Sequence, residues 1–397
     1  MNLNLKKYIE DKILPRYDEN DKGHGIDHII YVIDRSLRFA STVENINLDM
    51  VYTIAAYHDI GHSINPKNHE EVSAKILLED EELKKYFTTE EITIMSEAVN
   101  DHRASLEHEP RSIYGKIVSS ADRNTNLEVP FKRTYEYRKK HFGSISLKQI
   151  IDESYEHLLN KFGKKGYATE KMYFEDIEYK IFLEKLQSLL QERSEFDRKY
   201  IQINGLEKDI IREQIESYIP YNEQEDIDKK VFLSFIDSFD DVLTRENTYG
   251  HLTSSAFVVN EDLSKALILH HNIFNGFIYS GGHADGEFDL YSVAVREVFE
   301  ETGLEVFPLI DNNIFAIQSL PIKGHIKKGK YVPAHIHYDI LYLLVAKNID
   351  MDKIRVLESE NSQVKWCNLE DTYNEEAVEW IRPINEKIVK KIRSIRK

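Results

Sequence analysis

Hydrophobic positions follow a helical period through the first half of the chain. Apolar residues recur at steps of three and four in residues 28–39, 51–57, 91–99 and 173–190. Few glycines or prolines interrupt these segments, so the pattern predicts an almost wholly helical domain. We place the end of this domain near residue 203, and the first domain is therefore expected to cover residues 1–203.

From residue 251 the pattern alternates with a period of two. Strands are expected on both sides of a turn at Asn260-Glu261-Asp262, at 251–260 and 265–271, and a strand followed by a loop is expected over 274–287. Further strands are expected at 306–322, 335–347 and 362–371. One helix is expected before Gly303 and another over residues 371–397. Strands mixed with helices predict an α/β fold for a second domain, residues 204–397.

The overall composition limits the classes of function. A length of 397 residues is typical of two domains. The net charge of −17 argues against stable nucleic-acid binding, but a bound cation can still attract a small anionic substrate. The single cysteine, Cys367, excludes a disulfide framework and a cysteine-based zinc site. The chain shows no apolar signal core and no run long enough to span a membrane, so we expect a soluble cytoplasmic protein.

An acidic stretch follows a pair of glycines in the second half. Glu297, Glu300 and Glu301 fall at i, i+3 and i+4, so a helix places all three carboxylates on one face. Such crowded charges are tolerable when Mg²⁺ or Mn²⁺ lies among them, because these ions take oxygen ligands. The Gly281-Gly282 pair allows a tight turn before the helix, and Gly303 is expected to end it. The alternative is a solvated acidic helix.

Histidines and aspartates are the informative residues of the first half. They are His28 at the start of a helix, the pair His58-Asp59 at the end of the next helix, and then His69, His102 and Asp122. Adjacent His58 and Asp59 point about 100° apart on a helix, yet both can reach one ion between two helices. Neutral imidazole and carboxylate together suit Mn²⁺, Fe²⁺, Zn²⁺ or similar ions.

The acidic stretch resembles the Nudix box, G-x5-E-x7-R-E-(apolar)-x-E-E-x-G-(apolar). Its second half matches at every position from Arg296 to Leu304. Its first half departs: counted from Gly282, the glutamate position holds Phe288, whereas counted from Gly281, Glu287 fits but one extra residue precedes the arginine. The stretch is similar to the GGHADG variant of the box.

The Nudix resemblance covers roughly residues 245–375 and implies an α/β/α sandwich with a mixed sheet. It also implies cleavage of a nucleoside-diphosphate-type bond with one or more Mg²⁺ or Mn²⁺ ions. Glu297, Glu300 and Glu301 would be the metal ligands, and Arg296 would pair with a box carboxylate and orient it. The base would be one of these glutamates or an acid in a later loop. The loop candidates are Glu358 and Glu360, for which a merely solvated position is the alternative.

The histidine series resembles the HD-domain phosphohydrolases, whose order H…HD…D on an all-α bundle holds one metal ion. The resemblance covers roughly residues 20–130. It implies a first ion on His28, His58, Asp59 and Asp122, with Asp59 among the catalytic residues. His69 and His102 stand where a second ion would be held in some members. The implied site takes one or two ions of Mn²⁺, Fe²⁺, Co²⁺, Ni²⁺ or Zn²⁺.

Other polar residues are candidates for substrate binding. His24 and His62 each lie four residues from a proposed ligand, and they either brace that ligand or contact a substrate phosphate, or have no part in the site. Arg123 could meet a phosphate or form an ordinary salt bridge.

The second domain has candidates of the same kind. Gly282 and His283 lie in the box loop, as does Asp285, and would contact substrate or brace the loop. Alternation places His335, His337 and Asp339 on one strand face, which lines either the substrate cleft or a polar outer surface.

Together these features predict a bifunctional phosphohydrolase for a nucleotide-type phosphorylated small molecule. The Nudix half would cleave a diphosphate bond, and the HD half would hydrolyse a phosphomonoester or phosphodiester. One alternative is a nucleotide sensor, in which one half binds without turnover and regulates the other. Another is an HD half with di-iron oxygen chemistry. A homo-oligomer is compatible with the sequence, and no membrane partner is expected.

Overall fold

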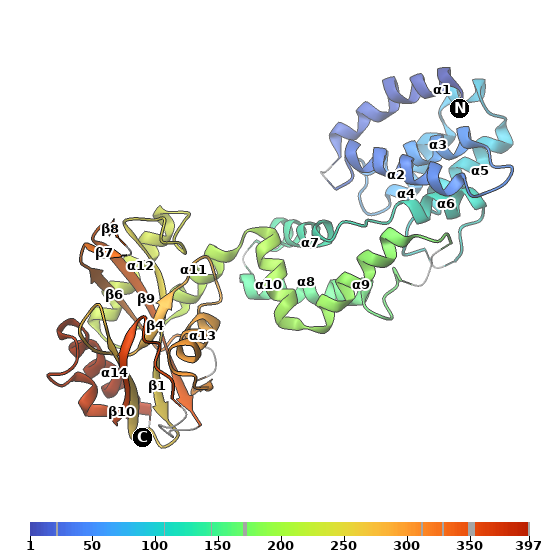
Figure 1. Ribbon diagram of the computed structural model, residues 1–397. Helices are drawn as coiled ribbons and strands as arrows, with labels where there is room; N and C mark the ends of the chain where they lie inside the picture. The colour runs from blue at the N-terminus through green and yellow to red at the C-terminus, as the bar shows by residue number, and fades with distance from the viewer. Residues whose placement is uncertain are drawn as a thin grey trace. The chain divides into compact units, whose positions relative to one another are not determined.

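A computed structural model describes residues 1–20, 23–106, 108–143, 145–169, 173–310, 313–327, 329–347 and 354–395. The chain forms two compact units, Met1–Asn204 and Gly205–Lys397 (Figure 1). The expected order of a helical region followed by a mixed sheet with helices is confirmed. In the part of the chain that the structure describes, no helix combines the length and the apolar character that crossing a membrane requires.

The first unit is helical from end to end. It contains a π-helical turn at Ile9–Ile13 and short 3₁₀ segments at Leu14–Glu19 and Glu81–Lys85, and α-helices form most of the rest. They are α1 (Leu3–Tyr8), α2 (Ile26–Ala40), α3 (Leu48–Tyr57), α4 (His69–Leu78), α5 (Thr89–Asn100), α6 (Ile113–Ala121), α7 (Glu128–His141), α8 (Leu147–Phe162), α9 (Ile177–Gln191) and α10 (Arg193–Asn204).

Helix α3 is the centre of this unit. Its residues from Met50 to Tyr57 are all buried, so the helix is apolar on every side rather than amphipathic. Asn47 caps its N-terminus, accepting hydrogen bonds from the backbone of Asp49 and Met50. Because α3 is packed on all sides, it holds His58 and Asp59, which follow its last turn, in a fixed position.

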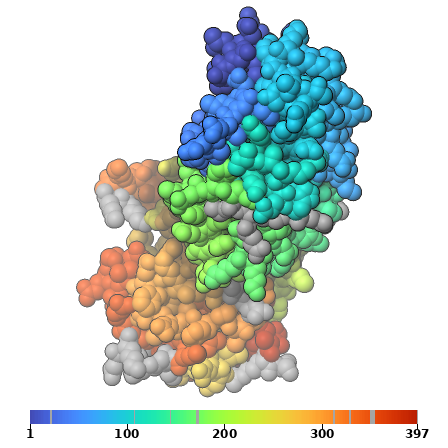
Figure 2. Space-filling view, turned by 90° about the vertical axis from the view of Figure 1, so that its right-hand side faces the viewer, coloured from blue at the N-terminus to red at the C-terminus, as the bar shows by residue number. Residues whose placement is uncertain are grey.

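Helices α7–α10 belong to the same unit and pack beside the first six helices, as the blue-to-green atoms of Figure 2 show. Buried Arg35 of α2 reaches across to Asp176 and Glu178 at the start of α9. Phe39 and Phe174 stack with ring centroids 5.3 Å apart. These contacts fix the far helices against the α2 side of the bundle.

The second unit is built on an eight-stranded mixed sheet, which follows helices α11 (Glu207–Ser217) and α12 (Glu223–Ser238). The long strand β1 runs parallel to β9 and antiparallel to β2 and β4. The strands of this sheet are β1 (Gly250–Asn260), β2 (Lys265–His271), β3 (Gly276–Ile278), β4 (Ser280–His283), β5 (Val306–Pro308), β6 (Ala316–Ile322), β9 (His335–Ala346) and β10 (Asn361–Asn368). A separate hairpin is formed by β7 (His325–Lys327) and β8 (Lys330–Val332).

Two helices cover opposite faces of the sheet (Figure 1). Helix α13 (Leu290–Thr302) packs on the face that carries Ser254, whose hydroxyl donates to the Leu290 carbonyl. Helix α14 (Arg382–Ile395) packs on the face that carries Phe257 and Leu341. Because neighbouring residues of a strand point to opposite faces, this arrangement is the expected α/β/α sandwich.

The expected segments 306–322 and 371–397 differ most in extent from the structure. The segment 306–322 forms two strands, β5 and β6, which pair with different parts of β9, while Asp311 and Asn312 lie outside the described residues. The last helix begins only at Arg382, after the 3₁₀ turns Leu369–Tyr373 and Glu379–Ile381. Pro383 explains the late start, because proline lacks a backbone N–H and fits only the first turn of a helix.

Candidate metal-binding sites

The candidate ligands of the helical unit all lie at or near helix ends. His28 is in the first turn of α2, and His69 is the first residue of α4. His58 caps the C-terminus of α3, with Asp59 directly after it. His102 follows α5 by two residues and Asp122 caps the C-terminus of α6. The fold therefore gathers residues from five helices, and the sequence order alone does not show that these ends meet.

A first group consists of His28, His58 and Asp122, whose ligand atoms lie within 4.8 Å of one another. The His28 Nε2 atom is 3.1 Å from Asp122 Oδ1 and 3.6 Å from Asp59 Oδ2. The His58 Nε2 atom is 3.5 Å from the same oxygen of Asp59 and 3.8 Å from Asp122 Oδ1. Two imidazoles and two carboxylate oxygens thus face one point.

A second group lies on the other side of Asp59. Its Oδ1 atom is 3.1 Å from His69 Nε2 and 3.4 Å from His102 Nε2, and these two nitrogens are 3.3 Å apart. Asp59 therefore presents one carboxylate oxygen to each group. This geometry suits two ions that share a carboxylate between them.

Backbone carbonyls orient three of these histidines. The Nδ1 atoms of His58, His69 and His102 lie 2.8, 3.1 and 2.6 Å from the carbonyls of Ala55, Pro66 and Val99. Each carbonyl can only accept, so it holds a proton on Nδ1 and leaves the Nε2 lone pair facing Asp59. This is the form of histidine that binds a metal ion.

The electrostatics of the centre also favour a cation. Burial opposes a charge on His28, but hydrogen bonds to Asp122 and Asp59 outweigh it and raise the pKa of His28 to about 9. Burial likewise opposes a charge on Asp59, yet the surrounding histidines hold its pKa well below the usual range. The Nε2 atom of His58 is fully buried and makes no hydrogen bond. A buried imidazole nitrogen without a hydrogen-bond partner fits a ligand of a divalent cation.

Two further histidines form one side of this centre. The rings of His24 and His62 stack with centroids 3.8 Å apart, and the ring of His62 lies 5.2 Å from that of His69. Asn20, which the sequence did not single out, donates to the carbonyls of His24 and Asp59 at 2.9 and 3.1 Å. These contacts place His24 and His62 beside the second group rather than inside it.

The guanidinium of Arg123 points elsewhere. It donates to the Ala168 carbonyl at 2.8 Å and lies 5.1 Å from the ring centroid of Tyr179. Lys161 of α8 is a half-buried cation that the sequence did not single out. Burial and the charge of Arg133 lower the pKa of its ammonium, whereas the charge of Asp122 raises it. Only tertiary packing brings Lys161 and Asp122 into electrostatic range of each other.

Gly61 explains how the His58-Asp59 turn approaches α4. A Cβ atom at this position would lie 2.8 Å from the backbone nitrogen of Ser73 and 2.8 Å from Cβ of Val72. The Gly61 amide itself donates to Ser73 Oγ at 2.9 Å. The turn that carries Asp59 can therefore come this close to the helix of His69 only without a side chain at position 61.

The second candidate site is the acidic face of α13. Gly303 ends this helix as expected, with φ 73° in the left-handed region. Glu301 is buried, Glu297 is half-buried and Glu300 is exposed. Arg296 lies 3.9 Å from Glu297 and 3.8 Å from Glu300, so it pairs loosely with both.

The carboxylate of Glu297 packs directly against the backbone of Gly282. A Cβ atom on Gly282 would lie only 2.3 Å from Glu297 Cδ. Ser280 and Asn361 donate to the two oxygens of Glu301, the latter at 2.9 Å. These contacts hold Glu297 and Glu301 against strand β4.

Both carboxyl groups are hard to ionise in the absence of a cation. Burial and the charges of Glu301 and Glu300 raise the pKa of Glu297 to about 7. Burial, together with the charge of Glu360, raises the pKa of Glu301 to about 7, although hydrogen bonds from Ser280 and Asn361 oppose this. Two carboxylates of this kind fit a hard divalent cation, which would relieve their repulsion.

The remaining acidic candidates lie in two loops. Glu360 is exposed, and its charge affects both Glu297 and Glu301, so it belongs to the same electrostatic environment. Glu358 is exposed, and its backbone carbonyl accepts from Asn272 at 3.1 Å. Glu287 is half-buried in the box loop, and its backbone donates to the Ala284 carbonyl at 2.9 Å.

The histidines of the second unit converge. The ring of His251 in β1, which the sequence did not single out, contacts His283 of β4 and both His335 and His337 of β9. His337 also contacts His283 and His335. Asp339 lies on the same strand but is fully engaged, since it accepts hydrogen bonds from Thr253, Ser255, Tyr279 and Gln318. On this face of β9, His335 and Asp339 are buried and His337 is half-buried, so the face is not an exposed outer surface.

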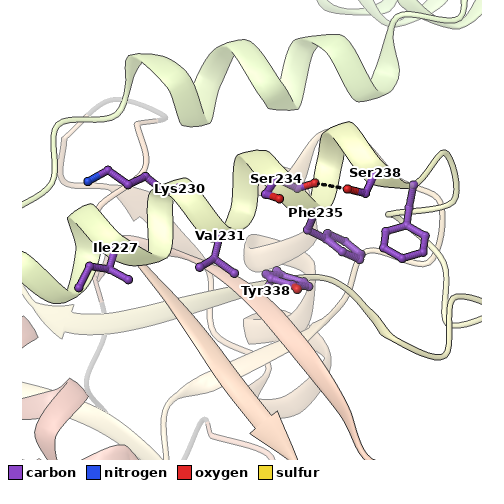
Figure 3. A pocket seen from close by; sticks show the side chains of 8 residues that line it. Ile227, Lys230, Val231, Ser234, Phe235, Ser238 and Tyr338 are labelled. Atoms are coloured by element: carbon purple, nitrogen blue, oxygen red, sulfur yellow. Dashed lines mark hydrogen bonds between the residues drawn. The ribbon is translucent and has the colours of Figure 1, made fainter.

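A groove on the second unit lies apart from these ligands. It has a volume of about 420 Å³ and is lined mainly by α12, together with Tyr338 of β9 (Figure 3). Phe235 and Tyr338 stack within it, with ring centroids 4.1 Å apart. None of the residues that line it is a candidate metal ligand.

Two known family models match the chain, one in the helical unit and one in the unit with the sheet. Residues 25–127 match the family model of the HD domain, and residues 250–390 match that of the NUDIX domain. Both resemblances inferred from the sequence are therefore confirmed. No curated protein matches this chain significantly.

Solved structures of both kinds are similar to parts of the chain. A NUDIX-family hydrolase from Clostridium perfringens is 20% identical, with 36% of this chain and 97% of that chain covered and a TM-score of 0.28. A predicted HD-superfamily hydrolase from an uncultured Thermotogales bacterium is 22% identical, with 40% and 94% covered and a TM-score of 0.28. An Ap4A hydrolase from C. elegans is 17% identical, with 36% and 96% covered and a TM-score of 0.25.

Proposed function

The chain contains an HD domain followed by a NUDIX domain, and we propose that it is a bifunctional, metal-dependent phosphohydrolase. The NUDIX half cleaves a nucleoside-diphosphate-type bond, and the HD half hydrolyses a phosphomonoester or phosphodiester of a nucleotide. We place the boundary between the two halves near residue 203. Divalent cations, when bound, would neutralise phosphate charge and lower the pKa of water at both sites.

The observation that supports the HD activity best is the shared carboxylate of Asp59. It faces the His28 group with one oxygen and the His69 group with the other. In our proposal His28, His58, Asp59 and Asp122 hold one ion of Mn²⁺, Fe²⁺, Co²⁺, Ni²⁺ or Zn²⁺, and Asp59, His69 and His102 hold a second. His24 and His62 then lie on the side from which a substrate phosphate approaches, and Lys161 adds positive charge near Asp122.

The observation that supports the NUDIX activity best is the pair Glu297 and Glu301. Burial raises the pKa of each carboxyl to about 7, and a bound cation would favour the ionised form of both. In our proposal Glu297, Glu300 and Glu301 hold Mg²⁺ or Mn²⁺, and Arg296 orients Glu297 and Glu300. Glu360, or one of the box glutamates, accepts the proton of the attacking water.

A hydrolysis screen of nucleotides, dinucleotides and nucleotide sugars with Mg²⁺, Mn²⁺ and Co²⁺ tests both activities. Glu301→Gln should lower diphosphate cleavage at least about 100-fold and leave phosphoester hydrolysis intact, and Asp59→Ala should do the reverse. Glu305→Gln and Asp34→Ala serve as matched controls, because both remove an exposed carboxylate outside the sites.

Two results would contradict this proposal. If the wild type binds a nucleotide but turns over nothing, the NUDIX half is a sensor. If the HD half purifies with iron and consumes oxygen in an Asp59-dependent reaction, its chemistry is oxidative rather than hydrolytic.

A further inference from the structure

Four histidines of the NUDIX unit form a cluster that is separate from the acidic face of α13. The parallel pairing of β1 with β9 sets His251 beside His337. The antiparallel pairing of β1 with β4 sets His283 beside Thr253, two residues along the same strand from His251. His335 lies two residues before His337, on the same face of β9. Three strands therefore supply the cluster, and we call these four residues the histidine cluster.

The distances within the histidine cluster suit shared ligation. The ligand nitrogens of His251, His283 and His337 all lie within 4.8 Å of one another. The Nε2 atoms of His335 and His337 are 3.0 Å apart, and the ring of His335 lies 4.9 Å from that of His251. Nitrogen ligands about 2 Å from one tetrahedral ion are roughly 3.3 Å apart, so only small movements are needed.

Backbone carbonyls orient the histidine cluster as they orient the HD ligands. The Nδ1 atom of His335 lies 2.8 Å from the Pro333 carbonyl, and Nδ1 of His251 lies 3.5 Å from the Asn247 carbonyl. Protons on these two atoms leave both Nε2 lone pairs directed into the cluster. His251 is 4% exposed, and its Nε2 atom is buried without a hydrogen bond. A buried nitrogen of this kind fits a metal ligand.

The charges around the histidine cluster favour nitrogen ligation over anion binding. The rings of His283 and His337 lie 5.1 and 4.9 Å from that of His251, and in such a cluster both burial and mutual repulsion disfavour charged rings. Neutral imidazoles bind metal ions but attract a phosphate poorly. The nearby cation Arg245 is paired with Asp285 through its Nε atom at 2.7 Å, which balances its charge.

We propose that His251, His283 and His337, with His335 as the fourth imidazole, bind one first-row transition-metal ion, with Zn²⁺ as the best match. Imidazole suits Zn²⁺, Cu²⁺ and Ni²⁺, whereas Mg²⁺ requires oxygen ligands. The neighbouring carboxylates are occupied, Asp285 by Arg245 and Asp339 by four hydrogen bonds. The site is therefore chemically different from the glutamate site of α13.

The position of the site indicates what the ion does. His283 directly follows Gly282, which carries Glu297 against its backbone. An ion on the histidine cluster links β1, β4 and β9 immediately before the loop that leads into α13. It therefore stabilises the end of β4 on which the position of Glu297 depends.

Metal binding to the full-length chain tests this site. The starting protein carries His58→Ala, Asp59→Ala and Glu301→Gln, which weaken the other two sites, and excess Mg²⁺ is present throughout. We expect one tightly bound Zn²⁺ per chain by competition with a chromophoric chelator, and visible absorption bands of a nitrogen-ligated ion when Co²⁺ is used instead. Adding His251→Gln and His337→Gln should weaken Zn²⁺ binding at least about 100-fold. His325→Gln is the matched control, since His325 lies on β7, outside the cluster.

Several outcomes would overturn the proposal. They are Zn²⁺ binding that Mg²⁺ displaces, binding that survives the double histidine substitution, and the absence of tight Zn²⁺ binding in the starting protein. Circular dichroism shows whether the substituted protein folds. If it does not fold, X-ray absorption of the Zn²⁺-loaded starting protein is measured in place of the binding comparison. A first coordination shell with at least three imidazoles supports the site, and an oxygen-dominated shell refutes it.

Discussion

Replacing Glu301 by Gln should stabilise the metal-free NUDIX unit above pH 7 and weaken its response to Mg²⁺. Glu301 is 4% exposed, and burial raises the pKa of its carboxyl from 4.5 to about 7. A carboxyl whose pKa is raised by folding contributes its full stability below pH 4.5, and that contribution is lost as the pH rises through 7. The metal-free wild type should therefore become less stable between pH 5 and pH 8.

The magnitude follows from the shift in pKa. Each unit corresponds to about 1.4 kcal/mol, so the charge on Glu301 costs about 3 kcal/mol at pH 8. Glutamine removes this cost but can accept with only one oxygen, whereas Ser280 and Asn361 both donate to Glu301. A lost hydrogen bond costs about 1 kcal/mol, which leaves a net gain of about 2 kcal/mol. For a unit of this size the gain raises Tm by roughly 4–8 °C.

Tryptophan fluorescence can follow this unit within the full chain. The sequence has two tryptophans, Trp366 and Trp380, and both lie in the second unit. Thermal unfolding would be measured in EDTA and in Mg²⁺ at pH 5 and pH 8, for the wild type, Glu301→Gln and the control Glu305→Gln. At pH 5 the Glu301→Gln protein should be no more stable than the wild type, because the carboxyl is then largely protonated. Mg²⁺ should stabilise the wild type and the control but have much less effect on Glu301→Gln.

One pattern of results would refute this reasoning. If Glu301→Gln lowers Tm equally at pH 5 and pH 8, and Mg²⁺ still stabilises it as much as the wild type, Glu301 is a structural residue whose charge does not matter. The raised pKa would then give no support to a cation at this position.

Three further predictions test individual contacts. Gly282→Ala would place a Cβ atom 2.3 Å from Glu297 Cδ and should lower diphosphate hydrolysis at least about tenfold, measured beside unchanged phosphoester hydrolysis. Asp59→Asn should remove both ions of the HD centre, whereas His69→Gln should remove only one, as the metal content after dialysis would show. Gly61→Ala should lower the free energy of unfolding of the helical unit by roughly 1–3 kcal/mol in urea, because the new methyl group would lie 2.8 Å from the backbone of α4.

The fold class was predictable because its signals are local. Helical periodicity in the first half and alternation after residue 251 depend on near neighbours in the chain, and the structure confirms both. The late start of α14 was missed, since apolar spacing continues through residues that form 3₁₀ turns. Pro383 was the available signal for the true start of that helix.

The acidic face of α13 could be read from spacing alone, because i, i+3 and i+4 positions share a face on any helix. The burial of each glutamate could not be predicted from spacing. In the structure Glu301 is buried and Glu300 is exposed, although both belong to the same motif. Arg123 shows the same limit, because its guanidinium turns to Ala168 and Tyr179, which come from a later part of the chain.

The chemical types of the candidate ligands can be read from the order of residues: a series of histidines and aspartates, an acidic helix and a glycine pair. How these residues meet depends on the folded chain. It divides the two oxygens of Asp59 between two groups of histidines, and it brings His251 to His337 across the parallel pairing of β1 and β9. The physical reason is that ligand type is a property of each side chain, whereas convergence depends on the packing of segments far apart in the chain.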